Sequence, residues 1–346
     1  MKKLIALFLV LALSVCMFTA CASKAEEPAK EATTEAPAAE ETAPAAEETK
    51  EEAPATEEAK EITIGVSLQN LSEDFMIMLQ GAMENKVKEY DNVKLVFNDA
   101  ESDSAKQTSQ LESFIAQGVD AVILSPVDAD AMAPAVKEVV DAGIPCITCS
   151  ADVTGDMGQV WVGSENADGG ATEAQYVADQ LGGKGNVAVL RGPLGAFAEQ
   201  GRFQGYEEVF NQYPDIQIVF DQTANWQRDE AMALVENWLT TGTEINAICC
   251  QNDGMALGAY EAVKAAGKQD EIIITGIDAI EDALNSIKAG EMAATCFQDA
   301  IGQGEGALEM AIKAVNGESI EYTNIPFELV TIDNVDSYYD RIKLPG

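Results

Sequence analysis

Short apolar runs alternate with longer amphipathic stretches along most of the chain, from residue 62 onward. Each apolar run is typical of a buried strand. In the stretches between the runs, apolar residues recur at the three- and four-residue spacing of a helix, as with Leu111, Phe114 and Ile115. The alternation predicts parallel sheets that are covered by helices on both faces. The predicted strands are 62–67, 93–98, 121–125, 146–149, 186–190, 216–220, 247–250, 272–276 and 293–297.

Two segments of the chain repeat the same order of elements. The segment 90–141 runs strand, polar loop, helix, strand and helix, and the segment 213–266 does the same. The part of the chain that carries this pattern, about 285 residues, is long enough for two domains that each have a core. The predicted fold class is therefore α/β, with two similar doubly wound lobes.

The N-terminus predicts export and a lipid anchor. Two lysines precede the apolar run 4–17, which is short for a membrane span and typical of a signal peptide over residues 1–20. Residues 18–21 resemble a bacterial lipobox, in which Cys21 is lipidated and becomes the mature N-terminus. Ordinary cleavage by a signal peptidase is the alternative, because Phe18 stands where the lipobox usually has Leu.

A segment of low complexity follows the predicted signal peptide. Residues 21–60 are almost entirely Ala, Glu, Pro, Thr and Lys. So few apolar side chains cannot offset the entropy lost on ordering, and the prolines interrupt any helix. We expect a disordered acidic tether that lets the folded region extend away from the anchor.

Composition disfavours several classes of function. The formal net charge of -38 argues against nucleic-acid binding, which needs clustered Lys and Arg. The chain contains no His, which excludes Ser-His-Asp and Cys-His catalysis and every His-based metal site. We expect no metal and no cofactor.

The cysteines do not form a plausible disulfide framework. An odd number remains once those in the signal peptide and at the predicted lipidation site are set aside. Cys146 and Cys149 share one predicted strand at an odd offset, so they should point to opposite faces of the sheet as small buried residues.

Polar and aromatic side chains follow the predicted strands. In open parallel sheets, ligands bind beyond the carboxyl ends of the strands, where loops lead into helices. The sequence therefore predicts a ligand site where these loops meet. The loops are 69–76, 125–128 and 150–152 in the first half, and 195–200, 223–226, 252–253, 277–278 and 298–299 in the second.

The chain resembles the ribose, galactose and inositol class of periplasmic sugar-binding proteins. The resemblance rests on residues 64–67 (IGVS), 125–128 (SPVD), 143–145 (GIP), 251–259 (QNDGMALGA), 275–278 (TGID) and 293–298 (AATCFQ). It covers the whole predicted folded region, from residue 62 to residue 334, and its most specific part is the run 251–259.

The resemblance implies a type I periplasmic-binding-protein fold, in which two Rossmann-like lobes are joined by a three-segment hinge. We expect the chain to cross between the lobes near 164–165, 298–299 and 327–329. The N-terminal lobe would then comprise 61–164 with 299–327, and the C-terminal lobe 165–298 with 328–346.

The resemblance also implies a set of ligand-binding residues. Amides and carboxylates can exchange paired hydrogen bonds with vicinal hydroxyl groups, and two aromatic rings would face the apolar side of a sugar. Some members have structural interpretations as well: core packing for Trp226, packing at a helix start for Phe75, and a helix cap for Asn252. Asp253 is assigned to capping or to the hinge. The implied set is Gln69, Asn70, Glu73, Phe75, Met76, Ser125, Ser150, Gln200, Trp226, Asn252, Asp278 and Gln298.

Two positions depart from the ribose-binding members. Their Asp-Arg pair after the fourth strand is Ser-Ala here, at 150–151, and a further ligand-contacting Arg aligns with Gln200. Arg202, two positions on, is interpreted as structural. We therefore expect the carboxyl groups of Glu73 and Asp278 in the pocket but no cation, which disfavours an anionic ligand.

The predicted function is that of an extracytoplasmic substrate-binding lipoprotein of an ABC importer. It would bind a neutral monosaccharide or polyol by hinge closure and deliver it to ABC permease subunits. The protein would be a monomer, held at the outer face of the cell membrane by lipidated Cys21 alone. Two alternatives stay open: an amine-bearing ligand or a nucleoside in the same fold, and a sensory role for chemotaxis or a sensor kinase.

Enzymatic and regulatory functions are not expected. Glu73 and Asp278 would lie on opposite lobes, without a nucleophile, a metal site or a nucleotide fingerprint beside them. Repressors that share the two-lobe architecture carry a helix-turn-helix where this chain has its predicted export signal.

Overall fold

Five strands from the first half of the chain and one short strand from its C-terminal part form the first sheet, which lies between two pairs of helices. The computed structural model describes residues 60–344, so the predicted signal peptide, Cys21 and all of the predicted tether except Lys60 lie outside the described residues. The six strands follow the order β11-β5-β4-β3-β1-β2, and neighbouring strands are parallel. They are β1 (Ile62–Leu68), β2 (Val93–Asp99), β3 (Ala121–Leu124), β4 (Cys146–Ser150), β5 (Val160–Gly163) and β11 (Thr323–Asn324).

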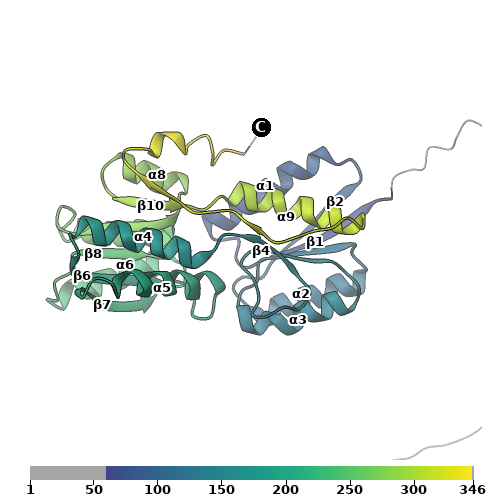
Figure 1. Cartoon of the computed structure of the whole chain (residues 1–346), viewed down its shortest axis with the longest axis horizontal. Coiled ribbons are helices and arrows are strands. Elements are labelled where there is room, and N and C mark those ends of the chain that lie inside the picture. The colour runs from purple at the N-terminus through teal and green to yellow at the C-terminus, as the bar shows by residue number, and fades with distance from the viewer. Residues whose placement is uncertain (1–59, 345–346) are drawn as a thin grey trace, which may run out of the picture. The chain divides into compact units, whose positions relative to one another are not determined.

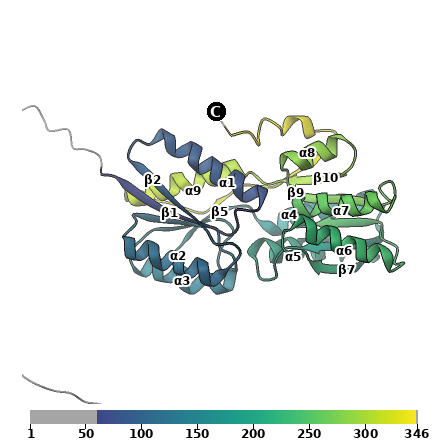
Figure 2. The ribbon, with the colours of Figure 1, turned by 180° about the vertical axis from the view of Figure 1, so that it is seen from behind.

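Helices cover both faces of this sheet. Helix α1 (Asp74–Lys86), which continues into η1 (Val87–Glu89), packs with α9 (Ala300–Val315) on one face, whereas α2 (Ser104–Gln117) and α3 (Ala129–Asp141) cover the other. Although α1 and α9 come from opposite ends of the chain, they lie side by side in both views (Figure 1, Figure 2). The alternating side chains of the strands supply a core on each face.

The second sheet repeats this plan. Its order is β12-β10-β9-β8-β6-β7, and its strands are parallel except for β12, which pairs with β10 antiparallel. Its strands are β6 (Lys184–Arg191), β7 (Asp215–Thr223), β8 (Ala247–Cys250), β9 (Ile273–Asp278), β10 (Ala294–Phe297) and β12 (Glu328–Thr331). One face carries α4 (Asn166–Gln180) and α5 (Phe197–Phe210), and the other carries α6 (Arg228–Thr240), α7 (Asp253–Ala265) and α8 (Glu281–Lys288), with η2 (Val335–Ser337) beside α8.

The apolar runs identified the main strands correctly. Every strand predicted in this way is present, and the prediction of two doubly wound α/β lobes is confirmed. The sequence analysis missed three short strands, namely β5, whose apolar run is only three residues long, and β11 and β12, which are two and four residues long. The expectation of purely parallel pairing is wrong for β12, which lies at an edge and returns antiparallel along β10. Residues 328 and 329, which the sequence analysis places in a crossing between the lobes, belong to β12.

The segments that cross between the sheets are bonded to one another. The backbone N–H of Glu165 donates to Asn324 Oδ1 at 3.2 Å, and Gln303 Nε2, near the start of α9, donates to Ser164 Oγ at 2.8 Å. The crossings therefore form one hydrogen-bonded junction. They lie at 164–165, 298–299 and 325–327.

The cysteines of the described residues are free and buried. Cys146 belongs to the core beneath α2 and α3, whereas Cys149 belongs to the core beneath α1 and α9. The prediction that these two residues of β4 point to opposite faces is confirmed.

Helices α4 and α5 approach closely because glycines face the partner helix. A Cβ atom on Gly170 would lie 2.0 Å from the carbonyl oxygen of Arg202, and one on Gly205 would lie 2.2 Å from the carbonyl oxygen of Ala167. Side chains do not fit so near a neighbouring backbone, so only glycine permits this spacing. The contact also sets the position of Arg202, which reaches the site described below.

Replacement of Gly205 by Ala should lower the free energy of unfolding by about 1–3 kcal/mol, because the added methyl group pushes α4 and α5 apart. That cost outweighs the better helix propensity of Ala. Chemical denaturation measures the change. Gly254→Ala in α7 is the matched control, since its added Cβ would meet no atom nearer than 3.5 Å. Equal stability of the two variants would show that Gly205 does not limit the helix spacing.

Candidate functional site

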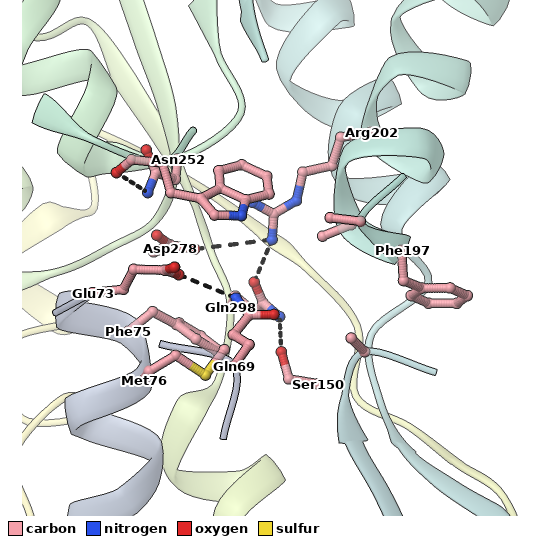
Figure 3. A pocket seen from close by; sticks show the side chains of 14 residues that line it. Gln69, Glu73, Phe75, Met76, Ser150, Phe197, Arg202, Asn252, Asp278 and Gln298 are labelled. Atoms are coloured by element: carbon pink, nitrogen blue, oxygen red, sulfur yellow. Dashed lines mark hydrogen bonds and ion pairs between the residues drawn. The ribbon is translucent and has the colours of Figure 1, made fainter. Parts of the chain in front are cut away.

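A cavity lies at the carboxyl ends of the strands, between loops and helix starts of both sheets (Figure 3). Together with its opening to solvent, the cavity comprises about 410 Å³ that protein atoms do not fill. Polar, charged and aromatic side chains converge on it. The lining residues are Gln69, Glu73, Phe75, Met76, Ser150, Ala151, Ala196, Phe197, Ala198, Arg202, Trp226, Asn252, Asp278 and Gln298.

The loop after β1 and the first turn of α1 form one wall. Gln69 directly follows the strand, Glu73 precedes the helix, and Phe75 and Met76 lie in its first turn. Figure 3 shows these four side chains close together. Because Phe75 and Met76 also belong to the core of the first lobe, packing holds this wall in place.

A hydrogen bond joins the carboxyl end of β4 to a crossing between the lobes. Ser150 ends β4 with a φ of 66°, and its Oγ accepts from Gln298 Nε2 at 3.5 Å. Gln298 belongs to the crossing between β10 and α9. The cavity floor is therefore part of the junction between the lobes.

Arg202 is the cation of the site. Its Nη2 donates to Gln298 Oε1 at 2.6 Å and lies 3.9 Å from Asp278 Oδ1, and its Nε donates to Asn166 Oδ1 at 3.2 Å. The guanidinium also donates to the carbonyl oxygen of Gln251. The expectation of a pocket without a cation is thus wrong. Arg202 has the structural role assigned to it, but the same side chain lines the cavity.

Burial makes both carboxyl groups of the cavity bind protons more readily. It raises the pKa of Glu73 to about 8, against the opposing effects of the Gln69 hydrogen bond and of Arg202. Gln69 Nε2 donates to Glu73 Oε2 at 3.1 Å. Burial likewise raises the pKa of Asp278, opposed by Arg202 and reinforced by the neighbouring carboxyl of Asp253.

Two aromatic rings belong to the core and line the cavity at the same time. Trp226 follows β7 with a φ of 63°, and its ring covers Gly192, where a Cβ would lie 2.1 Å from the indole. Only glycine leaves room for the ring in this place. Trp226 is part of the core of the second lobe, as Phe75 is of the first, and each ring is 7% exposed. Both residues therefore pack in a core and also form part of the cavity wall.

Asn252 combines a cap with a place in the wall. Its Oδ1 accepts from the backbone N–H of Met255 at 2.9 Å, which caps α7, and its Nδ2 donates to the Trp226 carbonyl at 3.4 Å. The next residue, Asp253, is buried outside the cavity lining and accepts from Thr295 Oγ1 at 2.7 Å.

Comparison with known proteins identifies the family. A family model described as a periplasmic binding protein domain matches residues 64–319. The chain belongs to the periplasmic binding protein family. This membership confirms the resemblance drawn from the sequence motifs.

Relatives of this periplasmic binding protein match along most of their length. A Rhizobium meliloti protein whose name refers to rhizopine binding is 41% identical over 287 residues, which cover 81% of this chain and 93% of the relative. A xylitol-binding protein of Mycolicibacterium smegmatis is 39% identical over 286 residues, 81% of this chain and 80% of the relative. These relatives are binding proteins, in agreement with the expectation that the chain is not an enzyme.

A solved structure has the same fold. An ABC transporter solute binding protein from Bacillus halodurans, crystallised with bound myo-inositol, superposes with a TM-score of 0.80 at 41% identity. The match covers 83% of this chain and all of the other, 100%.

Three residues of the implied ligand set lie outside the lining of this binding protein's cavity. The side chain of Asn70 bonds to a neighbouring loop: its Nδ2 donates to Ser102 Oγ, in the loop after β2, at 2.9 Å. Ser125 is buried at the end of β3, and exposed Gln200 donates to the Gly195 carbonyl at 3.1 Å.

The sequence analysis missed several members of the wall, namely Ala151, Ala196, Phe197, Ala198 and Arg202. The start of α5 supplies most of them. A signal for Arg202 was present: Glu199, Arg202, Tyr206 and Val209 recur at helical spacing, and all are buried. That stripe predicts an inward Arg202 and an outward Gln200.

Among residues 60–344, no cluster of metal-ligating side chains occurs. The same part of the chain has no helix with the length and apolar character of a membrane span.

Glu73 should make the stability of the protein depend on pH. Its folded-state pKa of about 8 exceeds the ordinary 4.5, so between these pH values the folded protein holds a proton that the unfolded chain releases. The free energy of unfolding therefore falls as pH rises through this window. Glu73→Gln should flatten the slope by up to about 1.4 kcal/mol per pH unit, the effect of one proton. Denaturation curves across the window test this.

The exposed residue Glu84, on the same helix, provides the control. Glu84→Gln changes the net charge equally but should leave the slope as it is. A Glu73→Gln slope equal to that of the native protein would contradict the raised pKa of Glu73.

Proposed function

We propose that this periplasmic binding protein binds a neutral monosaccharide or polyol between its two lobes and delivers it to an ABC importer. The observation that carries the proposal is a cavity between the two lobes whose wall combines two aromatic rings with amide, hydroxyl and carboxyl groups. The proposed ligand contacts are the members of the implied set that line it. They are Gln69, Glu73, Phe75, Met76, Ser150, Trp226, Asn252, Asp278 and Gln298.

The chemistry of the wall suits polyhydroxy compounds. An amide both donates and accepts hydrogen bonds, so it can pair with a hydroxyl group that acts as donor or as acceptor. The amides of the cavity wall belong to Gln69, Asn252 and Gln298. The rings of Phe75 and Trp226 offer apolar surface to the C–H face of a sugar or polyol. The names of the relatives support this class, since they refer to xylitol, ribose and bound myo-inositol.

Contacts between the lobes at the cavity rim support closure around the ligand. The backbone N–H of Ala129, at the start of α3, donates to the Gly195 carbonyl at 3.4 Å. Phe197 of α5 meets Trp161 of β5 edge to face, with 5.2 Å between the ring centroids. Separation of the lobes breaks these contacts. A ligand held by both lobes favours the closed state by its greater affinity for that state.

Import requires that the protein stay near a permease. The predicted signal peptide and lipidated Cys21 would place the protein at the outer face of the membrane, and the predicted tether would give it reach. The family also supports an extracytoplasmic location.

A thermal-shift screen of the purified protein against sugars and polyols tests the binding proposal. A true ligand should raise the melting temperature by mass action and lower the radius of gyration in solution scattering. Trp226→Ala should weaken its binding by about 2 kcal/mol or more, the cost of losing an aromatic anchor. Trp238→Phe, in the core of the same lobe, should leave affinity unchanged. A screen without any hit among sugars and polyols would overturn the proposal.

Cell fractionation tests the anchor. Cys21→Ser should move the protein from the membrane fraction to the soluble extracytoplasmic fraction, because the variant has no thiol to lipidate. Ligand affinity should stay the same, since Cys21 precedes the folded residues. Membrane retention of the variant would contradict lipidation at Cys21.

A further inference from the structure

One carboxyl oxygen in the cavity lacks a partner. Glu73 Oε2 accepts from Gln69, whereas Glu73 Oε1 is buried without a hydrogen bond to any described residue. The residue is 9% exposed and lines the cavity. A buried acceptor left unpaired is costly, so a bound ligand that donates to Oε1 gains the whole benefit of that pairing.

The charge of Glu73 is also unbalanced. The other carboxyl of the cavity, Asp278, lies 3.9 Å from Arg202, but no Lys or Arg of the described residues lies within ion-pair distance of Glu73. The carboxyl of Asp99, at the end of β2, adds repulsion, and Asp74 is the next residue along the chain. The lining side chains thus comprise two acids and a single base.

Aromatic rings flank the unpaired group. Phe75 and Trp226 line the same part of the cavity as Glu73, and the rings attract cations through their π faces. The Arg202 guanidinium already lies 5.7 Å from the Trp226 ring centroid. A ligand that carries a positive charge would meet a carboxylate and aromatic faces together.

We propose that Glu73 selects a ligand in which a protonated amine replaces one hydroxyl group of the polyol or sugar. This inference rests on the proposed function: it keeps the same cavity and the polyhydroxy frame of the ligand and replaces the neutral ligand by an amine-bearing one. A hydroxyl group forms an ordinary hydrogen bond with the neutral carboxyl of Glu73, whereas an ammonium group forms a stronger, charge-assisted hydrogen bond with the carboxylate.

The two kinds of ligand differ in what happens to a proton. Because the pKa of Glu73 is about 8, the carboxyl is mostly protonated at neutral pH. An ammonium group needs the carboxylate, so its binding releases the Glu73 proton to the solvent, and its affinity rises with pH as long as the pH stays below the pKa values of both Glu73 and the amine. A neutral polyol leaves the proton where it is. The charged groups that bear on this titration are Asp74, Asp99, Arg202, Arg228 and Asp278.

Calorimetric titration of the purified protein with matched pairs tests the proposal. The pairs are myo-inositol with its monoaminodeoxy isomers, and D-glucose with D-glucosamine. An amine should bind at least about tenfold more tightly than its parent, the effect of a charge-assisted hydrogen bond. Titrations at pH 7 in two buffers of different ionisation enthalpy should show proton release with the amine alone.

Variants separate Glu73 from general charge effects. Glu73→Gln keeps the shape and should remove both the preference for the amine over its neutral parent and the proton release. Glu84→Gln removes the same charge from an exposed site on α1 and should preserve both. Tight binding of a neutral compound with no gain from its amine overturns the inference and leaves the proposed function intact. Failure of all neutral and amino compounds to bind overturns the proposed function, and the inference with it.

Discussion

The guanidinium of Arg202 holds the junction between the lobes together. It donates to Asn166, directly after the first crossing, and to Gln298 in the second. Its charge lies 5.8 Å from the ring of Phe327 in the third. A buried charge is stable only where polar groups surround it, so these segments must keep their positions around Arg202. The connections between the lobes therefore converge on one side chain.

The same residue couples the junction to the cavity. Arg202 lies beside Asp278 and bonds to Gln298, and both line the cavity. Its own position depends on the close contact of α4 with α5, which Gly170 and Gly205 allow. Backbone packing, hinge geometry and pocket electrostatics are therefore not separable here. A change in helix spacing would shift the charge that opposes the proton affinity of Asp278.

Sequence patterns predicted the fold where burial is complete. The run 121–124 is apolar without interruption because β3 is covered on both faces, and the run 247–250 in β8 is similar. Edge strands such as β12 are short and half-exposed, so their pairing depends on where the chain returns, which no local pattern records. The loops at the strand ends predicted most of the cavity wall, because parallel strands bring their carboxyl ends to one edge. The orientation of Asn70 and Gln200 depends on individual hydrogen bonds that the sequence does not display.

The path of β1 has a mechanical consequence. The strand starts at Ile62 on the edge away from the cavity, and its seven residues span about 23 Å before Gln69 reaches the site. Whatever precedes Lys60 is thus attached to one lobe alone, behind the cavity. A force applied at that end therefore acts directly on the first lobe and reaches the second lobe only through the junction.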